Sequence, residues 1–281
     1  MKKVISASRR TDLVAFFPDW LAEAVREEKA VVLAPSGRIL TVGLNPGNVH
    51  TFVLWSKNFR NLIENRSGLR DGLSKYDQLY FHFTITGMGG TQVEREVPSP
   101  EDALRQLEPL LSVAGQPGRI SLRFDPVIYR TEGDEIRTNL RFFEVLAEKA
   151  ASLEIRDIRF SFAQWYGKSK RRAERLGFAY VDPALEVKRK DALYLAGVAG
   201  RNRLNLYCCS QDFLADLPGV RPSACIDGQL LQACHPEGLP ASVSKDRTQR
   251  RECRCTESVD IGSYTQTCPH SCVYCYANPR L

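Results

Sequence analysis

The sequence predicts an α/β fold, a full or partial (β/α) TIM-like barrel, followed by a cysteine-rich tail. Strand-like and helix-like segments alternate along the chain, which is typical of βα units around a parallel sheet. Six segments read as strands and recur at about 40 residues per unit, a spacing that suits such a barrel. All nine cysteines lie after residue 207. We therefore expect residues 1–215 to form the barrel, and residues 216–281 to form a cluster-binding segment packed on its mouth.

The expected elements can be justified in chain order. Pro18 suits the first position of a helix, and Ser99 with two following acidic residues suits a helix start. The expected helices are Pro18–Glu28, one beginning at Ser99, Asn139–Ser152 and Ala184–Ala199. The expected strands are Val4–Ser8, His50–Trp55, Gln78–Thr86, Arg119–Asp125, Ile158–Gln164 and Arg203–Cys209, with a short hairpin formed by Val31–Leu33 and Ile39–Gly43.

The expected strands alternate between apolar and polar side chains. In the third strand, Phe81 and Phe83 alternate with His82 and Thr84, and the three later strands repeat this pattern. Parallel strands buried on both faces usually read as continuous apolar runs. The alternation therefore predicts a polar barrel interior that serves as a ligand cavity, because unpaired buried polar groups are costly. An antiparallel sheet with one solvated face is the alternative.

Composition restricts location and partners. No apolar run approaches the length of a membrane span, and the first residues lack the apolar segment of a secretion signal, so a cytoplasmic location without membrane contact is expected. The net charge of +6 is partly local, in basic runs within 168–175 and 188–190. These runs are typical of solvated helix faces, and phosphate binding is the alternative.

The strongest chemical signal is the C-x3-C-x2-C spacing of Cys268, Cys272 and Cys275. Cysteines crowded at one end of a chain favour metal binding over a disulfide scaffold. A [4Fe–4S] cluster normally takes four cysteines, so three would leave one iron open for chemistry. The alternative is a structural zinc ion, completed by His270 or another cysteine.

This motif, Cys-Pro-His-Ser-Cys-Val-Tyr-Cys, resembles that of the radical S-adenosylmethionine superfamily, especially its spore photoproduct lyase branch. The chain also resembles the uncharacterised bacterial family called domain of unknown function 1848. The matching pieces are Ile5–Asp12, Trp55–Asn58, Phe83–Gly87, Arg123–Pro126 and Asp260–Gly262, with the terminal cysteines.

The resemblance to the radical enzymes implies a function and its cofactors. Cys268, Cys272 and Cys275 would ligate a [4Fe–4S] cluster, S-adenosylmethionine would chelate the open iron, and one electron would release a 5′-deoxyadenosyl radical. Tyr274 would lie near the adenine. The implied partners are an electron donor such as flavodoxin or ferredoxin and an unidentified substrate, for which nucleic acid is one candidate.

The position of the motif departs from that of the radical enzymes, where it follows the first barrel strand. Here it stands near residue 281, as in a circular permutation, which a barrel tolerates because its first and last strands are neighbours. The glycine-rich segment that binds the methionine group would correspond to Gly87, Gly89 and Gly90. A simple turn is the alternative interpretation of these glycines.

Two further groups complete the candidate site. Cys209, Cys225, Cys253 and Cys255 could hold a second cluster or a zinc ion, with buried free thiols as the alternative. Cys208 and Cys234 belong to neither group. The candidate catalytic residues are polar side chains expected at strand ends, where they could bind a carboxylate or phosphate or form a salt-bridge layer. They are Arg9, Arg10, Asp12, Lys57, Arg123 and Asp125, with Gln164 and Gln211 beside them.

These observations favour a radical S-adenosylmethionine-type enzyme. Two alternatives remain open at this point: a non-catalytic protein binding zinc or an iron–sulfur cluster, and a nucleic-acid-binding or repair protein.

Overall fold

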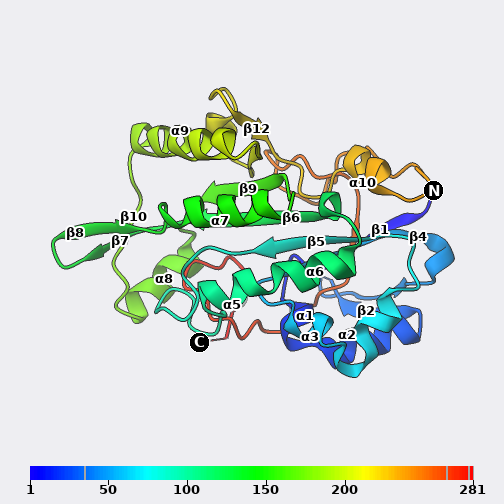
Figure 1. The fold of residues 1–281 in the computed structure, drawn as a ribbon. Helices are drawn as coiled ribbons and strands as arrows, with labels where there is room; N and C mark the ends of the chain where they lie inside the picture. Colours follow the sequence, from blue (N-terminus) through cyan, green and yellow to red (C-terminus); the bar gives the residue numbers. More distant parts are fainter. Residues whose placement is uncertain (35, 264, 278, 281) are drawn as a thin grey trace.

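One parallel sheet of eight strands forms the centre of the protein (Figure 1). The computed structural model describes residues 1–34, 36–263, 265–277 and 279–280. Every neighbouring pair in the sheet is parallel, and the spatial order is β12-β11-β9-β6-β5-β4-β1-β13. The strands are β1 (Lys3–Ala7), β4 (Val49–Ser56), β5 (Leu79–Thr84), β6 (Ile120–Val127), β9 (Asp157–Phe162), β11 (Asn205–Cys208), β12 (Val220–Pro222) and β13 (Val259–Asp260).

The sheet differs from the expected barrel at its two edges. All six predicted strands are present, but β12 and β13 extend the sheet at opposite ends and, within the described residues, do not pair with each other. Of the full or partial barrel expected, the described residues therefore form a large parallel α/β sheet that does not close. The physical reason is that the segment joining these short strands, residues 223–258, packs inside the sheet rather than bringing its edges together. Because β12 and β13 belong to the sheet, the cysteine-rich segment is integrated into the main fold.

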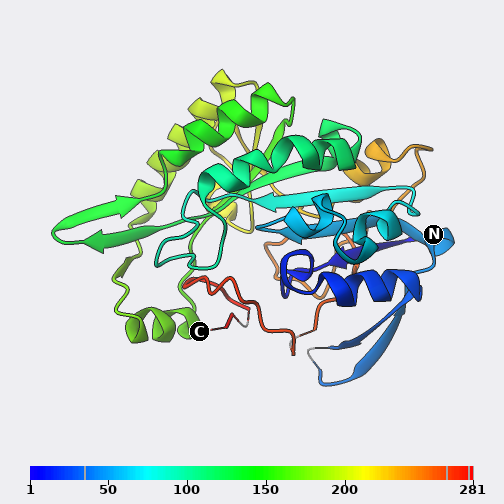
Figure 2. The same cartoon turned by 60° about the horizontal axis from the view of Figure 1, so that its bottom comes forward.

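Helices cover one face of the sheet (Figures 1 and 2). These are α1 (Leu13–Phe16), α2 (Pro18–Arg26), α3 (Arg60–Ile63), α4 (Leu69–Leu73), α5 (Pro100–Arg105), α6 (Leu107–Ala114), α7 (Phe142–Ser152) and α9 (Leu185–Arg201). They bury the apolar row of the strands, including Phe52, Phe81 and Phe124, in one hydrophobic core. Two helices, α8 (Gly167–Arg175) and α10 (Gly228–Cys234), pack elsewhere.

Local sequence explains the helix starts. Pro18 stands at the first position of α2, and the Ser99 hydroxyl accepts a hydrogen bond from the Asp102 amide at 3.1 Å at the start of α5. Helix α10 was not predicted, and Asp227 caps it by accepting from two backbone amides.

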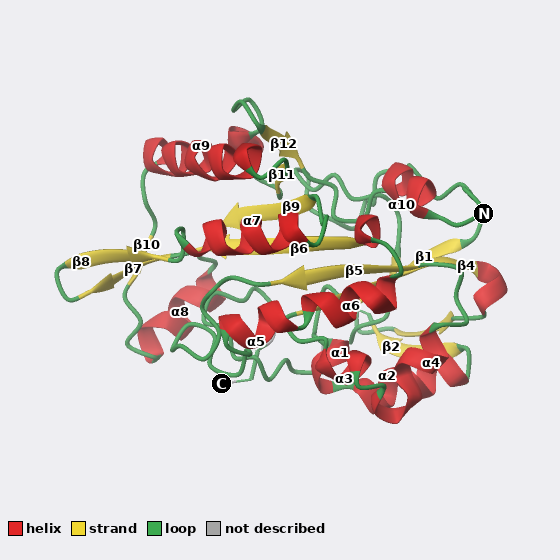
Figure 3. Ribbon diagram, in the orientation of Figure 1, coloured by secondary structure: helices red, strands yellow, loops and turns green. Residues whose placement is uncertain are grey.

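Small antiparallel units extend from the main sheet. The predicted hairpin is present as β2 (Lys29–Leu33) and β3 (Ile39–Gly43), while a second sheet forms from β7 (Tyr129–Glu132), β8 (Glu135–Thr138) and β10 (Tyr180–Val181). Figure 3 shows the hairpin of β7 and β8 projecting away from the parallel sheet. Four short 3-10 helices lie in the connections: η1 (Pro46–Asn48), η2 (Arg66–Gly68), η3 (Pro117–Arg119) and η4 (Asp212–Leu214).

The polar row of the strands faces the segment 223–258, which confirms a polar interior. His82 Nε2 lies 2.7 Å from the Cys225 carbonyl oxygen, and Arg159 donates to the Ala224 carbonyl at 3.2 Å. Arg159 also donates to the Ser121 hydroxyl of the neighbouring strand. The inserted segment therefore supplies backbone partners to one nitrogen each of His82 and Arg159. Among the described residues, no helix combines the length and apolar character needed to cross a membrane.

Candidate functional site

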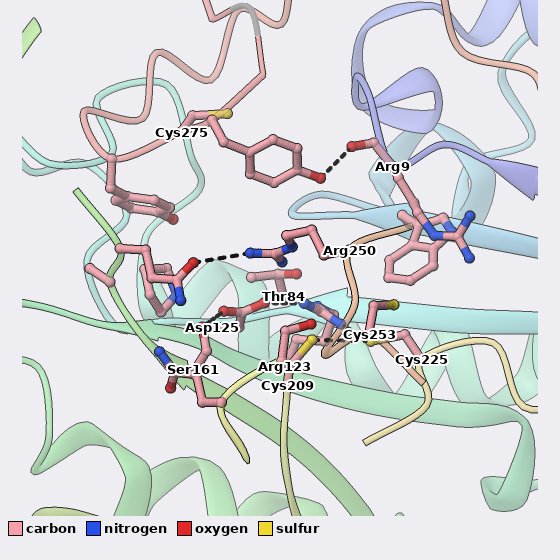
Figure 4. Close-up of a pocket in the computed structure, with 18 of the residues that line it drawn as sticks. Arg9, Thr84, Arg123, Asp125, Ser161, Cys209, Cys225, Arg250, Cys253 and Cys275 are labelled. Carbon is pink, nitrogen blue, oxygen red and sulfur yellow. Dashed lines mark hydrogen bonds and ion pairs between the residues drawn. The ribbon is translucent and has the colours of Figure 1, made fainter. Parts of the chain in front are cut away.

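A cavity of about 290 Å³ lies at the carboxyl ends of the strands, where parallel sheets commonly place their sites. Residues at or just after the ends of β1, β4, β5, β6, β9 and β11 line it, together with residues of the cysteine-rich segment. The charged lining residues are Arg9, Lys57, Arg123, Asp125 and Arg250. Figure 4 shows Cys275 on one side of this cavity, with Cys209, Cys225 and Cys253 on the other.

The loop that carries Cys268, Cys272 and Cys275 is fixed from two sides. Arg172 of α8 donates from Nη1 to the carbonyl oxygens of Val273 and Cys275, both at 2.8 Å. The Arg172 side chain is almost fully buried, whereas the sequence predicted a solvent-exposed basic helix face at 168–175. A single guanidinium therefore fixes the backbone of the cysteine loop.

His270 fixes the other side of this loop. Its Nε2 lies 2.8 Å from Asp12 Oδ2, and its Nδ1 lies 3.1 Å from the carbonyl oxygen of Glu96. Asp12 also accepts from the Ser56 hydroxyl and the Lys57 amide. Because both ring nitrogens of His270 already face oxygen partners, this histidine is not available to complete a zinc site.

A buried charged network lies beneath the loop. Glu94 is fully enclosed and accepts from Lys57 Nζ at 2.8 Å, from Thr86 Oγ1 at 2.7 Å and from the Tyr274 hydroxyl. Burial alone would raise the pKa of Glu94, but the Lys57 charge and these hydrogen bonds hold the pKa below its usual range. Burial likewise disfavours the charged Lys57, but Glu94 and nearby groups raise the Lys57 pKa. Tyr274 is thus placed by a buried ion pair.

The three tail thiols are strongly desolvated. Burial raises the pKa of Cys268 to about 12, raises that of Cys272 well above its usual range and also raises that of Cys275. Charges on Cys275 and Cys268 also raise the pKa of Cys272, whereas the charge of Lys57 lowers it. Metal binding at these cysteines must therefore displace protons.

The chemistry of this donor set fits an iron–sulfur cluster. Lys57 interacts electrostatically with Cys272 and Cys275, and Arg172 with Cys275; these cations can offset the negative charge of thiolate ligands. Across residues 1–34, 36–263, 265–277 and 279–280, no three His, Cys, Asp or Glu side chains meet in a group that could hold a metal ion. The donor chemistry thus supports the site, while a converged set of ligands is not seen among these residues.

The second cysteine group is brought together from three separate segments. Cys209 Sγ lies 3.7 Å from Cys225 Sγ, and Cys225, Cys253 and Cys255 belong to one buried cluster against which Cys209 packs. Interactions with Cys209 and Cys255, with the charge of Arg123, hold the pKa of Cys225 well below its usual range. Interaction with Cys255 lowers the pKa of Cys253 to about 6. All four cysteines line the cavity.

The predicted catalytic residues divide between cavity and scaffold. Arg9, Lys57, Arg123 and Asp125 line the cavity, and Arg123 forms an ion pair with Asp125. Arg10 and Asp12 do not belong to its lining in the described structure.

The two residues outside the cavity lining have scaffold contacts. Arg10 donates to the Gly262 carbonyl at 2.8 Å, and Asp12 anchors His270. Gln164 and Gln211 both line the cavity, and the Gln211 amide also bridges the Phe162 backbone through its oxygen and nitrogen.

The predicted cofactor-binding glycines lie away from the cavity lining. Gly87 and Gly90 adopt positive φ, and a Cβ at Gly89 would stand 1.8 Å from the Pro98 carbonyl oxygen. Backbone conformation and close packing thus explain why this turn needs glycine. The turn leads to Glu94, so it contributes to the site indirectly.

Several important residues were not found from the sequence. Glu94 and Arg172 carry the contacts that hold the cysteine loop, yet each stands among charged residues that read as a surface. Asp260 accepts hydrogen bonds from Ser6, Ser8 and the Arg9 amide, which joins β13 to the end of β1. Only Asp260 had a sequence signal, as part of a matching family segment.

These features define an α/β protein with a parallel sheet and a cysteine-lined polar cavity at the carboxyl ends of its strands. The chain belongs to the family described as Domain of unknown function (DUF1848), whose profile matches residues 4–277. No match is found among curated proteins.

Proposed function

We propose that the protein is a radical S-adenosylmethionine-type iron–sulfur enzyme whose cluster is held by Cys268, Cys272 and Cys275. The observation that carries this proposal is that Cys275 and Tyr274 line the same cavity as Lys57 and Arg123. The C-x3-C-x2-C resemblance supports it independently. We infer as well that the curved sheet is an incomplete barrel whose mouth is covered by the cysteine loop.

A cluster bound here would supply one electron to cleave S-adenosylmethionine into methionine and a 5′-deoxyadenosyl radical. The residues of the chain would position the reactants. Arg9 and Arg123 offer guanidinium groups to a carboxylate or phosphate, and Asp125 offers an acceptor to an amino group. Tyr274 is held by Glu94 at the cavity wall, in position to contact an adenine.

The available space supports a cofactor and a substrate together. A second hollow of about 590 Å³ shares Tyr166, Gln249, Arg250 and Tyr276 with the first cavity. Ligand pockets commonly measure about 300–1,000 Å³, so the second hollow falls within this range and the first lies at its lower limit. The electron would come from a donor such as flavodoxin or ferredoxin.

Anaerobic reconstitution tests the proposal directly. Protein treated with ferrous iron and sulfide should turn brown, and addition of S-adenosylmethionine and dithionite should yield 5′-deoxyadenosine. Cys272→Ala should abolish that yield, whereas Cys208→Ala should retain it, because Cys208 lies in the core on the helix-covered face of the sheet. Undiminished yield from folded Cys272→Ala protein would contradict the assignment. A wild-type protein that holds iron but produces no 5′-deoxyadenosine would favour the non-catalytic alternative.

One observation favours nucleic acid as the substrate class. Lys168 and Arg171 of the basic helix α8 line the second hollow together with Arg250. Such a surface can bind phosphates, so affinity for single-stranded or duplex DNA should fall steeply with salt. Absence of binding at low salt would remove this candidate.

A further inference from the structure

The four cysteines of the second group come from distant positions in the chain. Cys209 follows β11, Cys225 follows β12, and Cys253 and Cys255 precede β13. Three of them belong to a small buried cluster with Val4 and Val53, inside the sheet. The two cysteines outside both groups are placed differently: Cys208 packs on the helix-covered face, and Cys234 ends α10.

The four cysteines of this group lie close to one another. The Sγ atoms of Cys209 and Cys225 are 3.7 Å apart, and Cys225, Cys253 and Cys255 belong to one buried cluster against which Cys209 packs. With metal–sulfur bonds of about 2.3 Å, two thiolates on one tetrahedral metal lie about 3.8 Å apart. The same spacing applies to two thiolates that share one iron of a four-cysteine [2Fe–2S] cluster.

Hydrogen-bond donors surround these sulfurs. Arg123 Nη1 lies 2.8 Å from Cys225 Sγ, and the Ile226 amide lies 3.4 Å from Cys255 Sγ. Hydrogen bonds to sulfur are one of the means by which proteins tune iron–sulfur clusters. The donors therefore match an anionic sulfur-rich centre better than they match an apolar core.

Arg9 provides an independent sign of an additional acceptor. Its guanidinium interacts electrostatically with Cys255 and Cys225, and its Nη1 donates to Ser258 Oγ at 3.1 Å. Its Nη2 is buried and has no hydrogen-bond partner among the described residues. A buried guanidinium nitrogen without an acceptor is costly, so a bound anionic group would satisfy it.

We propose that Cys209, Cys225, Cys253 and Cys255 ligate a second iron–sulfur cluster, on the cavity wall opposite Cys275. Four thiolates would saturate this cluster, in contrast to the three at the tail. The proposal does not depend on the radical chemistry, because the two cysteine groups can be removed separately.

The test starts from the folded chain with Cys268, Cys272 and Cys275 all replaced by alanine. After anaerobic reconstitution with ferrous iron and sulfide, this variant should retain about half of the wild-type iron and acid-labile sulfide, if both clusters are of one type. Adding Cys225→Ser and Cys255→Ser should remove the remainder. Replacing Cys208 and Cys234 by serine instead should leave the remaining iron and sulfide content unchanged, since both cysteines lie outside the proposed ligand group.

Three outcomes would overturn the proposal. The variant with alanine at Cys268, Cys272 and Cys275 could contain no iron, or it could hold one zinc ion without sulfide. Alternatively, its cluster could persist after Cys225 and Cys255 are also replaced. Circular dichroism shows whether the serine variants fold. If they do not, the iron content and the Mössbauer spectrum of the wild-type protein give the number of clusters per chain. A single cluster per chain would contradict the proposal. A wild-type protein that yields no 5′-deoxyadenosine, together with iron retained in the variant without the three tail cysteines, would refute the proposed function alone.

Discussion

Glu94 shows how much of the site depends on one enclosed carboxylate. Both of its oxygens accept hydrogen bonds, from Lys57 and Tyr274 on one oxygen and from Thr86 on the other. It thereby joins the end of β4, the end of β5 and the cysteine loop. Replacing Glu94 should therefore disturb all three of these segments.

Breaking the Lys57–Glu94 pair should therefore be strongly destabilising. Lys57→Met or Glu94→Gln leaves one buried charge without its partner, which should lower the free energy of unfolding by about 3–5 kcal/mol. The double variant should recover part of this loss, and urea unfolding measures it. Arg189→Met, at the exposed pair with Asp216, is the matched control and should leave the free energy of unfolding nearly unchanged, because solvent screens this pair. Equal losses at the two pairs would contradict the role assigned to burial.

Tyr76 gives a residue-scale prediction of pH dependence. Burial raises its pKa from 10.0 to about 12, and its hydroxyl donates to the Leu44 carbonyl at 2.7 Å. The neutral phenol is favoured in the folded state, so its contribution to stability is complete below pH 10 and is lost as the pH rises toward 12.

The Tyr76→Phe variant isolates that contribution. It should be less stable than the wild type at neutral pH, by about 1 kcal/mol for one hydrogen bond. The difference between the two proteins should shrink between pH 10 and pH 12, as followed by urea unfolding. A difference that stays constant across this range would show that the phenol does not titrate as expected.

For single residues, the sequence predicted which strand residues face the cavity better than it predicted which residues hold the cysteine loop. Arg123 and Asp125 were expected at a strand end and do line the cavity, because strand periodicity decides which side chains face inward. Glu94 and Arg172 were missed, because their burial depends on contacts with a loop about 100 or more residues away in sequence. Periodicity within one segment carries no information about such partners.

Among the elements, α8 is hydrogen-bonded to the cysteine loop through Arg172. Arg172→Met should release the carbonyl oxygens of residues 273 and 275, so the loop should become a site of limited proteolysis while the sheet remains protected. Iron bound after reconstitution should fall several-fold. The neighbouring Arg171→Met is the matched control, because Arg171 is exposed. Equal proteolysis of both variants would refute this role.

The junction of β1 with β13 is tightly packed at Gly262. An added Cβ would lie 1.8 Å from Ser8 Oγ, so Gly262→Ala should reduce the free energy of unfolding by about 1–3 kcal/mol. Gly43→Ala is the control, because a Cβ there meets nothing within 4 Å and should leave stability unchanged or slightly increased. Calorimetric or urea unfolding of the two variants tests the difference; a neutral Gly262→Ala would show that the junction is loose.

The sequence revealed elements with long periodic patterns and missed short ones. The helices α2, α7 and α9 and the six long strands were predicted, because their apolar residues repeat over several positions. Strands β12 and β13 have three and two residues, too few for any repeat. These two strands form because the backbones of β11 and β1 are available to pair with them.

Across the whole molecule, these missed edge strands decide between an open sheet and a closed barrel. The βα alternation correctly predicted a parallel sheet with a polar inner face, and that information is local to each unit. Closure depends on the path of residues 223–258, whose irregular sequence has no periodic signal. The α/β class was therefore predictable, whereas the edges were not.

A truncated chain tests how the edge is protected. Ending the chain at Ser258 removes β13 and leaves β1 with an unpaired side, so the product should aggregate, as measured by sedimentation. The full-length chain with alanine at Cys268, Cys272 and Cys275 is the control, because it keeps β13 and should remain monodisperse. Aggregation of both would indicate that the cysteines, rather than strand pairing, prevent association.

The pairing of Ile5 with Val259 has a consequence for biosynthesis. On the ribosome, the first strand is made early, but its outer neighbour emerges only about 250 residues later, many seconds afterwards at usual elongation rates. During that interval the nascent chain presents an unprotected strand to the cell, and the cysteine loop has not yet been synthesised. If the tail cysteines bind the proposed cluster, its assembly must therefore be one of the last events in maturation, after most of the sheet has had time to fold.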